Sequence, residues 1–232
     1  MTPADDQDDV APGSLTLAVT ARAGWFVLSG PTGAGKTTLV RSWLAAEPDL
    51  VYARTVTTRS PRPGSEEFYD FVSPERFDDL VHSGEFLQWA APAPERRYGT
   101  LREPVVAALA KGDDVIVDYS PEMYLNARLQ LPEAVVGIFV APSSLDELAR
   151  RVRERGSEST ADANRRWALV RRDMALALEH HYYLINDDLE RAVQTVRAIR
   201  AAERARMANL DRSAPAFQLF GRPPVVRYAE GP

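Results

Sequence analysis

The stretch LSGPTGAGKTTLV, residues 28–40, decides the fold. Gly30 to Thr37 fit the pattern G-x-x-x-x-G-K-[ST], which forms a loop whose backbone N–H groups turn onto phosphate oxygens. A short apolar run at residues 25–28 precedes this loop, and a segment with helical spacing follows it and ends before Pro48. Strand, loop and helix in this order are the context that the motif requires. The stretch therefore predicts a nucleoside triphosphate site.

The residues of this loop have different expected roles. Lys36 is expected to reach the outer phosphates, and the Thr37 hydroxyl to bind Mg²⁺, the cofactor that accompanies ATP. The helix that starts at Lys36 adds its positive dipole end. Asp118 closes an apolar run, so we expect it to face the metal or the acceptor; a cap at the strand end is the alternative. The expected ATP-binding residues in the loop are Gly30, Thr32, Gly33, Ala34, Gly35, Lys36, Thr37 and Thr38.

Length and composition narrow the class of protein. The chain has 232 residues, 45% of them hydrophobic, which is enough for one sizeable α/β domain. A formal net charge of −5 argues against a surface that coats nucleic acid, and the lack of cysteine excludes disulfides and thiolate metal sites. No apolar run reaches the roughly 18 residues that span a membrane, and the acidic N-terminus is unlike a signal peptide. We expect a cytoplasmic monomer or homodimer that binds nucleotides, without nucleic-acid or membrane partners.

Apolar strands alternate with helices along the chain. Such alternation predicts an α/β fold with a parallel sheet covered by helices on both faces. Residues 54–100 are the exception, since their prolines and short apolar runs predict a β-rich lobe outside that sheet. The expected core strands lie at residues 25–28, 50–53, 115–118, 135–144 and 182–187.

Capping residues mark the expected helices. Ser73 is the expected N-cap of the helix before GEFLQW, and Gly112 is expected to end the helix that begins with REPV. Ser144 and Asp187, each followed three residues later by Glu, predict capping boxes. The Asp187 box opens a helix to about residue 208, and a long arginine-rich helix is expected at residues 161–179.

An arginine-rich loop suggests the acceptor. Arg59 and Arg62 flank a proline in TTRSPRPG, and planar guanidinium groups suit bidentate binding of a phosphate dianion. Tyr69 and Tyr98 could donate hydrogen bonds to the same group. Two solvated arginines in a polar loop are the alternative that these residues alone leave open.

The motifs together carry a family resemblance. TTRSPRPG, FYDFVS, GEFLQWA, YGT, REPV, ERGSES and LINDDLERA occur in the order and at nearly the spacings of guanylate kinases. The resemblance covers about residues 24–200. It implies a P-loop NTPase core, a monophosphate-binding lobe and a helical lid, and the transfer of the terminal phosphoryl group of ATP to GMP or dGMP with Mg²⁺. The implied division is an N-terminal arm (1–23), a core (24–53, 102–140 and 180–208), a lobe (54–101), a lid (141–179) and a C-terminal tail (209–232).

The resemblance also implies roles for single residues. Asn186 would lie near the adenine of ATP. The lid arginines Arg155 and Arg166 would close on the transferred group and act in catalysis with Lys36 and Arg59. The residues that would hold the acceptor phosphate or line the base site are Thr55, Arg59, Arg62, Tyr69, Gln88, Tyr98, Thr100, Asp118 and Ser120.

The expected base site departs from the family pattern. Gln88 stands where the family has Glu, and Ser120 where it has a second Asp. The loop after PRPG is also about two residues shorter. Guanine offers two adjacent donors, which a carboxylate accepts, whereas an amide has one acceptor and one donor group. An amide suits a base edge with one donor and one acceptor, such as that of adenine, cytosine, uracil or hypoxanthine. Two hypotheses follow: a guanylate kinase with relaxed selectivity, or a kinase retuned to another monophosphate.

Two other classes remain open at this point. Guanylate-kinase-like domains of scaffold proteins bind phosphopeptides without catalysis, but they usually lack the loop lysine that this chain has as Lys36. The ribose bisphosphate phosphokinases share a related fold and act on an acceptor that is not a nucleotide. TTRSPRPG and YGT argue against this second class.

Overall fold

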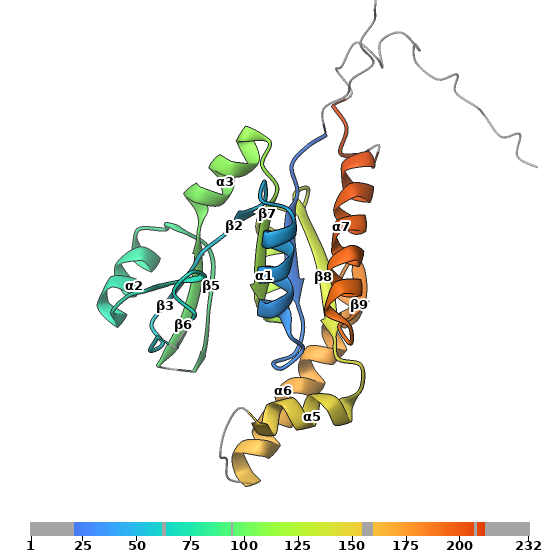
Figure 1. Cartoon of the computed structure of the whole chain (residues 1–232). Helices are drawn as coiled ribbons and strands as arrows, with labels where there is room; N and C mark the ends of the chain where they lie inside the picture. The colour runs from blue at the N-terminus through green and yellow to red at the C-terminus, as the bar shows by residue number, and fades with distance from the viewer. Residues whose placement is uncertain (1–20, 62–63, 94, 155–159, 207, 212–232) are drawn as a thin grey trace, which may run out of the picture.

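The computed structural model describes residues 21–61, 64–93, 95–154, 160–206 and 208–211, with the backbone alone at residues 93, 145, 151–154 and 160–166. It contains two sheets (Figure 1). The larger has the strand order β2-β7-β1-β8-β9, and all its neighbours are parallel. The predicted parallel sheet is therefore confirmed. Its strands are β1 (Trp25–Ser29), β2 (Val51–Tyr52), β7 (Val115–Tyr119), β8 (Val135–Ala141) and β9 (Tyr182–Ile185).

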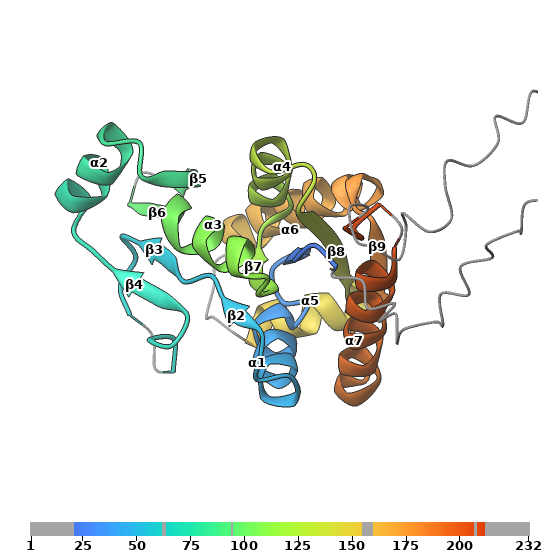
Figure 2. The same cartoon turned by 90° about the horizontal axis from the view of Figure 1, so that it is seen from above.

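Both faces of this sheet are buried at its three central strands, β7, β1 and β8. On β1 the side chains alternate: Phe26 and Leu28 belong to one apolar cluster, and Trp25 and Val27 to the other. Helices α1 (Lys36–Ala46) and α7 (Leu189–Ala205) cover the first face, and α3 (Arg102–Lys111) and α4 (Pro121–Gln130) contribute to the second. Figure 2 shows α1 and α7 on one side of the sheet and α4 on the other. Burial on both faces explains why these strands are continuously apolar.

The second sheet forms the β-rich lobe. Its strand order is β4-β3-β6-β5, and the lobe also carries helix α2 (Pro74–His82). A small apolar cluster that includes Phe77, Leu80 and Phe86 holds α2 against the sheet. The strands are β3 (Thr55–Thr57), β4 (Tyr69–Phe71), β5 (Phe86–Ala93) and β6 (Arg96–Leu101).

The segment between β8 and β9 is helical. It consists of α5 (Leu145–Glu154), α6 (Thr160–Ala175) and the 3₁₀ helix η1 (Leu176–Glu179). The predicted helix at residues 161–179 thus tightens into a 3₁₀ turn over its last four residues, a common way for a helix to end. In the parts of the chain that the structure describes, no helix is long and apolar enough to cross a membrane.

The capping predictions are confirmed at three helix ends. The Ser73 hydroxyl accepts from the Arg76 N–H at 3.2 Å, and the Ser144 hydroxyl accepts from the Glu147 N–H at 3.0 Å. Gly112 follows α3 with φ of +89°, the left-handed geometry that favours glycine.

Other helix ends differ from the prediction. Asp187 was wrong as the N-cap of α7, because Asp188 accepts from the Arg191 N–H at 2.8 Å while Asp187 pairs with the Arg191 side chain. The helix ends at residue 205, before the predicted 208. Helix α4 was not predicted, although Ser120 as N-cap with proline at the next position is a recognisable start signal.

A buried ion-pair network joins the end of α7 to the core. The Asp114 side chain is fully buried and accepts from Arg200 Nε and Arg204 Nε at 2.7 Å each, and from the Gly24 N–H at 2.8 Å. Arg200 also reaches Asp49, with Nη2 2.5 Å from Oδ2. One carboxylate therefore fixes the starts of β1 and β7 against the last turns of α7.

We expect Asp114→Asn to lower the free energy of unfolding by about 1–3 kcal/mol, because an amide has only one oxygen for the donors of Arg200, Arg204 and Gly24, although Arg200 keeps its pairs with Glu47 and Asp49. Urea unfolding followed by circular dichroism measures the change. The control is Arg22→Ala, which removes an exposed pair with Glu133 and should change stability by less than about 1 kcal/mol. Equal losses in the two variants would contradict the importance of the network.

Candidate functional site

The phosphate loop follows β1 through three glycines with positive φ. Gly30, Gly33 and Gly35 have φ of +146°, +89° and +85°. Gly30 has a second constraint, because a Cβ there would lie 2.3 Å from the carbonyl oxygen of Val140 on β8. Gly35 precedes the first residue of α1 and has no side chain to cap the helix. The first N–H groups of α1 are thus left for an anion, as the sequence motif predicts.

Two side chains support the loop from within. Lys36 Nζ donates to the carbonyl oxygens of Gly30 at 2.7 Å and Pro31 at 3.0 Å, so the ammonium group lies over the loop. Asn186, which is buried, donates from Nδ2 to the Ala34 carbonyl at 2.8 Å. Asn186 therefore lies at the loop and holds its backbone, while its expected proximity to adenine stays a prediction.

Asp118 connects the loop to the rest of the site. Its Oδ2 accepts from the Thr37 hydroxyl at 2.7 Å, and its Oδ1 accepts from the Tyr52 hydroxyl at 2.8 Å. A hydroxyl and a carboxylate side by side suit Mg²⁺, which keeps several water ligands and takes few from the protein. Tyr52 was missed by the sequence reasoning, because nothing in a short tyrosine-containing strand indicates a partner on β7.

The lobe presents a polar sheet face made of two cross-strand rows. In the first row Thr55 pairs with Tyr69 on one side and Thr100 on the other, and Thr100 pairs with Gln88. The pleat places residues two apart on the same face, so the second row lies beside the first. The second row is Phe71, Thr57, Tyr98 and Ala90. Four of the predicted acceptor residues therefore share one row, and Tyr98 lies in the next.

Arg59 lies against this face. Its guanidinium carbon is 4.4 Å from the ring centroid of Tyr69 and 5.3 Å from that of Phe71. Burial and the nearby charge of Asp118 raise the pKa of Tyr69 to about 12, so its hydroxyl stays protonated and can donate. The three predicted arginines Arg62, Arg155 and Arg166 lie outside the residues or side chains that the structure describes.

The far end of the first row holds a buried amide without partners. Gln88 is 5% exposed, and neither its Oε1 nor its Nε2 has a partner at hydrogen-bonding geometry within the described part of the protein. The amide nevertheless lies close to the hydroxyl of Tyr119, whose pKa is raised by burial and lowered by the side chains of Thr100 and Gln88. Thr100, its cross-strand neighbour, is hydrogen-bonded through Oγ1 to the hydroxyl of Tyr119. An unpaired buried amide destabilises a protein by about 1–3 kcal/mol. Such a group is expected where a ligand supplies the missing hydrogen bonds.

Ser120 has a structural role that the sequence did not reveal. Its hydroxyl accepts from the Met123 N–H at 3.3 Å and so caps α4, and the residue is exposed. Its place in the base site stays a prediction. Tyr119, the preceding residue, was missed as a site residue. Its position next to Asp118 in VIVDY was the only sign in the sequence that pointed to Tyr119 as a site residue. Its hydroxyl reaches Thr100 only because β7 packs against the lobe.

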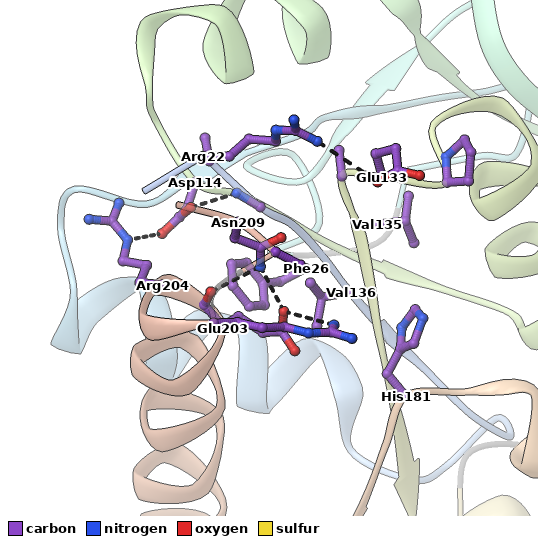
Figure 3. A pocket seen from close by; sticks show the side chains of 16 residues that line it. Arg22, Phe26, Asp114, Glu133, Val135, Val136, His181, Glu203, Arg204 and Asn209 are labelled. Atoms are coloured by element: carbon purple, nitrogen blue, oxygen red, sulfur yellow. Dashed lines mark hydrogen bonds and ion pairs between the residues drawn. The ribbon is translucent and has the colours of Figure 1, made fainter. Parts of the chain in front are cut away.

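A cavity lies at the opposite end of the parallel sheet from the phosphate loop. It has a volume of about 230 Å³ and is lined by residues such as Arg22, Glu133 and His181 (Figure 3). Asp114 and Glu203 on its wall are paired, Asp114 with Arg204 and Glu203 with Asn209. The residues of the phosphate loop and of the lobe face take no part in it.

Asp173 on α6 is a further group that the sequence did not indicate. Burial raises its pKa to about 6, against the lowering effect of the Lys36 and Arg172 charges, and Glu122 raises it further. The Asp173 carboxyl is half-buried, so its charged form is destabilised by the loss of solvent.

We expect Asp173→Asn to stabilise the nucleotide-free protein near pH 7 by about 1 kcal/mol, because it removes a carboxylate whose charged form is destabilised by burial. The raised pKa alone would imply a larger effect, but the side chain is partly solvated, which reduces it. The folded state binds the proton more tightly than the unfolded chain, whose pKa is near 3.8. The wild type therefore loses stability as the pH rises from about 4 through 6, and the difference between the two proteins should shrink toward pH 4. Urea unfolding between pH 4.5 and 7.5 measures it, and a difference independent of pH would contradict this origin.

Known proteins resemble this chain over most of its length. A family model described as guanylate kinase matches residues 23–203. The guanylate kinase of Synechococcus sp. (strain JA-3-3Ab) is 41% identical over 175 residues, which cover 75% of this chain and 80% of the relative. That of Rhodospirillum rubrum is 39% identical over 200 residues, which cover 85% and 91%.

A solved structure shows the same fold. The crystal structure of guanylate kinase from Anaplasma phagocytophilum has a TM-score of 0.70 and 23% sequence identity, and the match covers 84% of this chain and 93% of that one. The site geometry agrees with this likeness, since Asp118 accepts from Thr37 of the phosphate loop and from Tyr52, which packs against Phe68 of the lobe. The chain belongs to the guanylate kinase family and is a nucleoside monophosphate kinase.

Proposed function

We propose that this kinase transfers the γ-phosphoryl group of ATP, with Mg²⁺, to GMP, dGMP or a closely related nucleoside monophosphate. The relatives at about 40% identity are guanylate kinases, which supports GMP as an acceptor. In this proposal residues 54–101 bind the acceptor, and residues 141–179 act as the lid.

The observation that carries the proposal is the position of Asp118. Its carboxylate bonds to Thr37 of the phosphate loop, and its charge raises the pKa of Tyr69 in the lobe. Its other oxygen accepts from Tyr52, whose ring packs edge-on against Phe68 beside Tyr69, so the phosphate loop and the lobe meet at one carboxylate. Phosphoryl transfer needs two phosphates in line and little covalent assistance, so this arrangement suits it.

On the donor side, the loop amides and Lys36 would hold the β- and γ-phosphates. Lys36 is already positioned over the loop by its bonds to Gly30 and Pro31 and can exchange these carbonyls for phosphate oxygens. Thr37 and Asp118 would hold Mg²⁺, which would neutralise part of the charge that develops in the transition state.

On the acceptor side, the Arg59 guanidinium and the hydroxyls of Tyr69 and Tyr98 would bind the monophosphate. The Arg59 guanidinium lies over the rings of Tyr69 and Phe71 and forms no ion pair with a carboxylate among the described residues. Its positive charge is therefore available to bind a phosphate. The assignment of Arg62, Arg155 and Arg166 to the phosphates rests on the resemblance alone.

We expect ATP- and Mg²⁺-dependent ADP release with GMP and dGMP, and a fall of at least about a hundredfold in Lys36→Ala, because the lysine charge is removed from the transferred group. Coupled ADP release measures turnover, and mass spectrometry identifies the diphosphate product. The panel of acceptors includes the other nucleoside monophosphates and ribose phosphates. No turnover with any monophosphate, in protein that binds ATP, would contradict the proposal and favour a phosphopeptide-binding role. Turnover of ribose phosphates alone would favour the phosphokinase of that class.

The neutral amide of Gln88 suggests how the base is read. An amide can donate to O6 of a 6-oxopurine and accept from its N1–H, and hypoxanthine and guanine share this edge. The 2-amino group of guanine distinguishes the two bases, and a carboxylate at this position would accept from it. Gln88, Thr100 and Thr55 carry no charge, so the row offers no such carboxylate. We infer weak discrimination between GMP and IMP.

We expect kcat/KM for GMP and IMP to lie within about tenfold of each other, and Gln88→Glu to raise the preference for GMP by about tenfold or more, because a carboxylate accepts from both N1–H and the 2-amino group. The measurement is kcat/KM for both acceptors in both proteins. Thr57→Ser, in the neighbouring row, is the control and should leave the ratio unchanged. A wild-type preference for GMP above a hundredfold would overturn the base assignment and leave the kinase activity intact.

A further inference from the structure

The lid returns to the core through a half-buried histidine. His180 follows η1, and its ring stacks on Tyr124 of α4 with centroids 3.9 Å apart. Its Nδ1 lies 3.0 Å from the carbonyl oxygen of Leu176, within the last turn of the lid. Its Nε2 lies 2.9 Å from the hydroxyl oxygen of Ser29 on β1. The imidazole thus bridges the end of the lid and the strand that precedes the phosphate loop.

The partners of the ring fix its protonation state. A carbonyl oxygen can only accept, so Nδ1 carries the proton and donates to Leu176. Nε2 of the neutral ring is then an acceptor, and the Ser29 hydroxyl donates to it. Burial lowers the pKa of His180 to about 4, and the nearby charges of His181 and Arg128 lower it as well. The ring is therefore neutral near pH 7, and both hydrogen bonds have a defined direction.

Ser29 directly precedes the phosphate loop. It is fully buried, it is the last residue of β1, and its next neighbour is Gly30. Gly30 has no freedom to shift toward β8, because its Cα already lies against the Val140 carbonyl, and its own carbonyl accepts from Lys36. A displacement of Ser29 would therefore move the first turn of the loop.

The lid end is also fixed to α4. The carbonyl oxygen of Glu179 accepts from the Tyr124 hydroxyl at 3.0 Å and from Arg128 Nη1 at 2.7 Å. These two hydrogen bonds fix the position of η1 against α4. The contact between His180 and Ser29 adds a direct connection to β1, which the bonds to α4 do not supply.

We propose that His180 is a positioning residue that couples the end of the lid to the phosphate loop through the Ser29 hydroxyl. In this proposal the bond to Ser29, together with the bond to Leu176, sets the direction in which η1 and α6 leave the core. A lid that samples more directions occupies its nucleotide-binding orientation for a smaller fraction of the time. The apparent dissociation constant for ATP rises by the inverse of that fraction.

The test measures the Kd of a non-hydrolysable ATP analogue with Mg²⁺ by calorimetry in the full chain. His180→Phe keeps an aromatic ring over Tyr124 and removes both hydrogen bonds, and Ser29→Ala removes the other partner. We expect each variant to bind the analogue about five- to twentyfold more weakly, and the double variant to bind no more weakly than the weaker single variant. His180→Gln can still accept from Ser29 and should recover part of the affinity.

His181→Ala is the matched control. His181 is the adjacent half-buried histidine, and its Nδ1 accepts from the Gly137 N–H on β8 at 2.9 Å, away from Ser29. We expect this variant to lower the melting temperature and leave the Kd of the analogue unchanged. Losses of affinity that add in the double variant, or a Kd unchanged in His180→Phe, would overturn the proposal. Because the readout is nucleotide binding, the result does not depend on which acceptor the kinase uses.

Discussion

The close approach of Gly30 to β8 is the constraint on which the site depends. Strand β1 lies between β7 and β8, so the chain that leaves it must turn at once, and the Val140 carbonyl leaves no space there for a Cβ. After the turn, Lys36 lies above the start of the loop and donates to the Gly30 carbonyl. Helix α1 then begins without a side-chain cap on its first N–H groups. The same strand order sets the end of β7 beside this turn, so that Asp118 reaches Thr37. The anion site is therefore a result of sheet geometry as much as of the loop sequence.

The two ends of the expected acceptor site differ in charge and in burial. Near Asp118 the lobe face carries Arg59 and two phenols, which suit a doubly charged phosphate. At the other end the face is neutral and buried, with Gln88 unpaired beside the bonded hydroxyls of Thr100 and Tyr119. A neutral buried site discriminates by the match of donors and acceptors, because each mismatch leaves a group unpaired in a medium where water cannot compensate. Charge fixes the phosphate, and hydrogen-bond pattern selects the base.

Much of the fold could be predicted from the sequence because the signals were local. The glycine loop, the apolar strands, the Ser73 cap and Gly112 each depend on residues within one turn of chain. The misplaced cap at Asp187 shows the limit of such signals, since two adjacent aspartates compete and the Arg191 side chain decides between them. The partners that complete the site join residues far apart in the chain. Tyr52 meets Asp118, Tyr119 meets Thr100, and His180 meets Ser29 only after the sheet and the lobe have assembled. No local pattern encodes these contacts, and the resemblance to a family does not supply those that the family pattern lacks.

The position of β1 in the sheet has a consequence for synthesis of the chain. Trp25 pairs with Val115 on one side and Val135 on the other, so both neighbours of the first strand come from much later in the sequence. During synthesis the phosphate loop leaves the ribosome before β7 and β8, so the strand that supports it has no partner until both of these strands have also left the exit tunnel. Loop closure over such separations is slow, and the apolar strand β1 stays exposed meanwhile. The phosphate loop therefore gains its supporting sheet only after β8 has been synthesised, long after the loop itself.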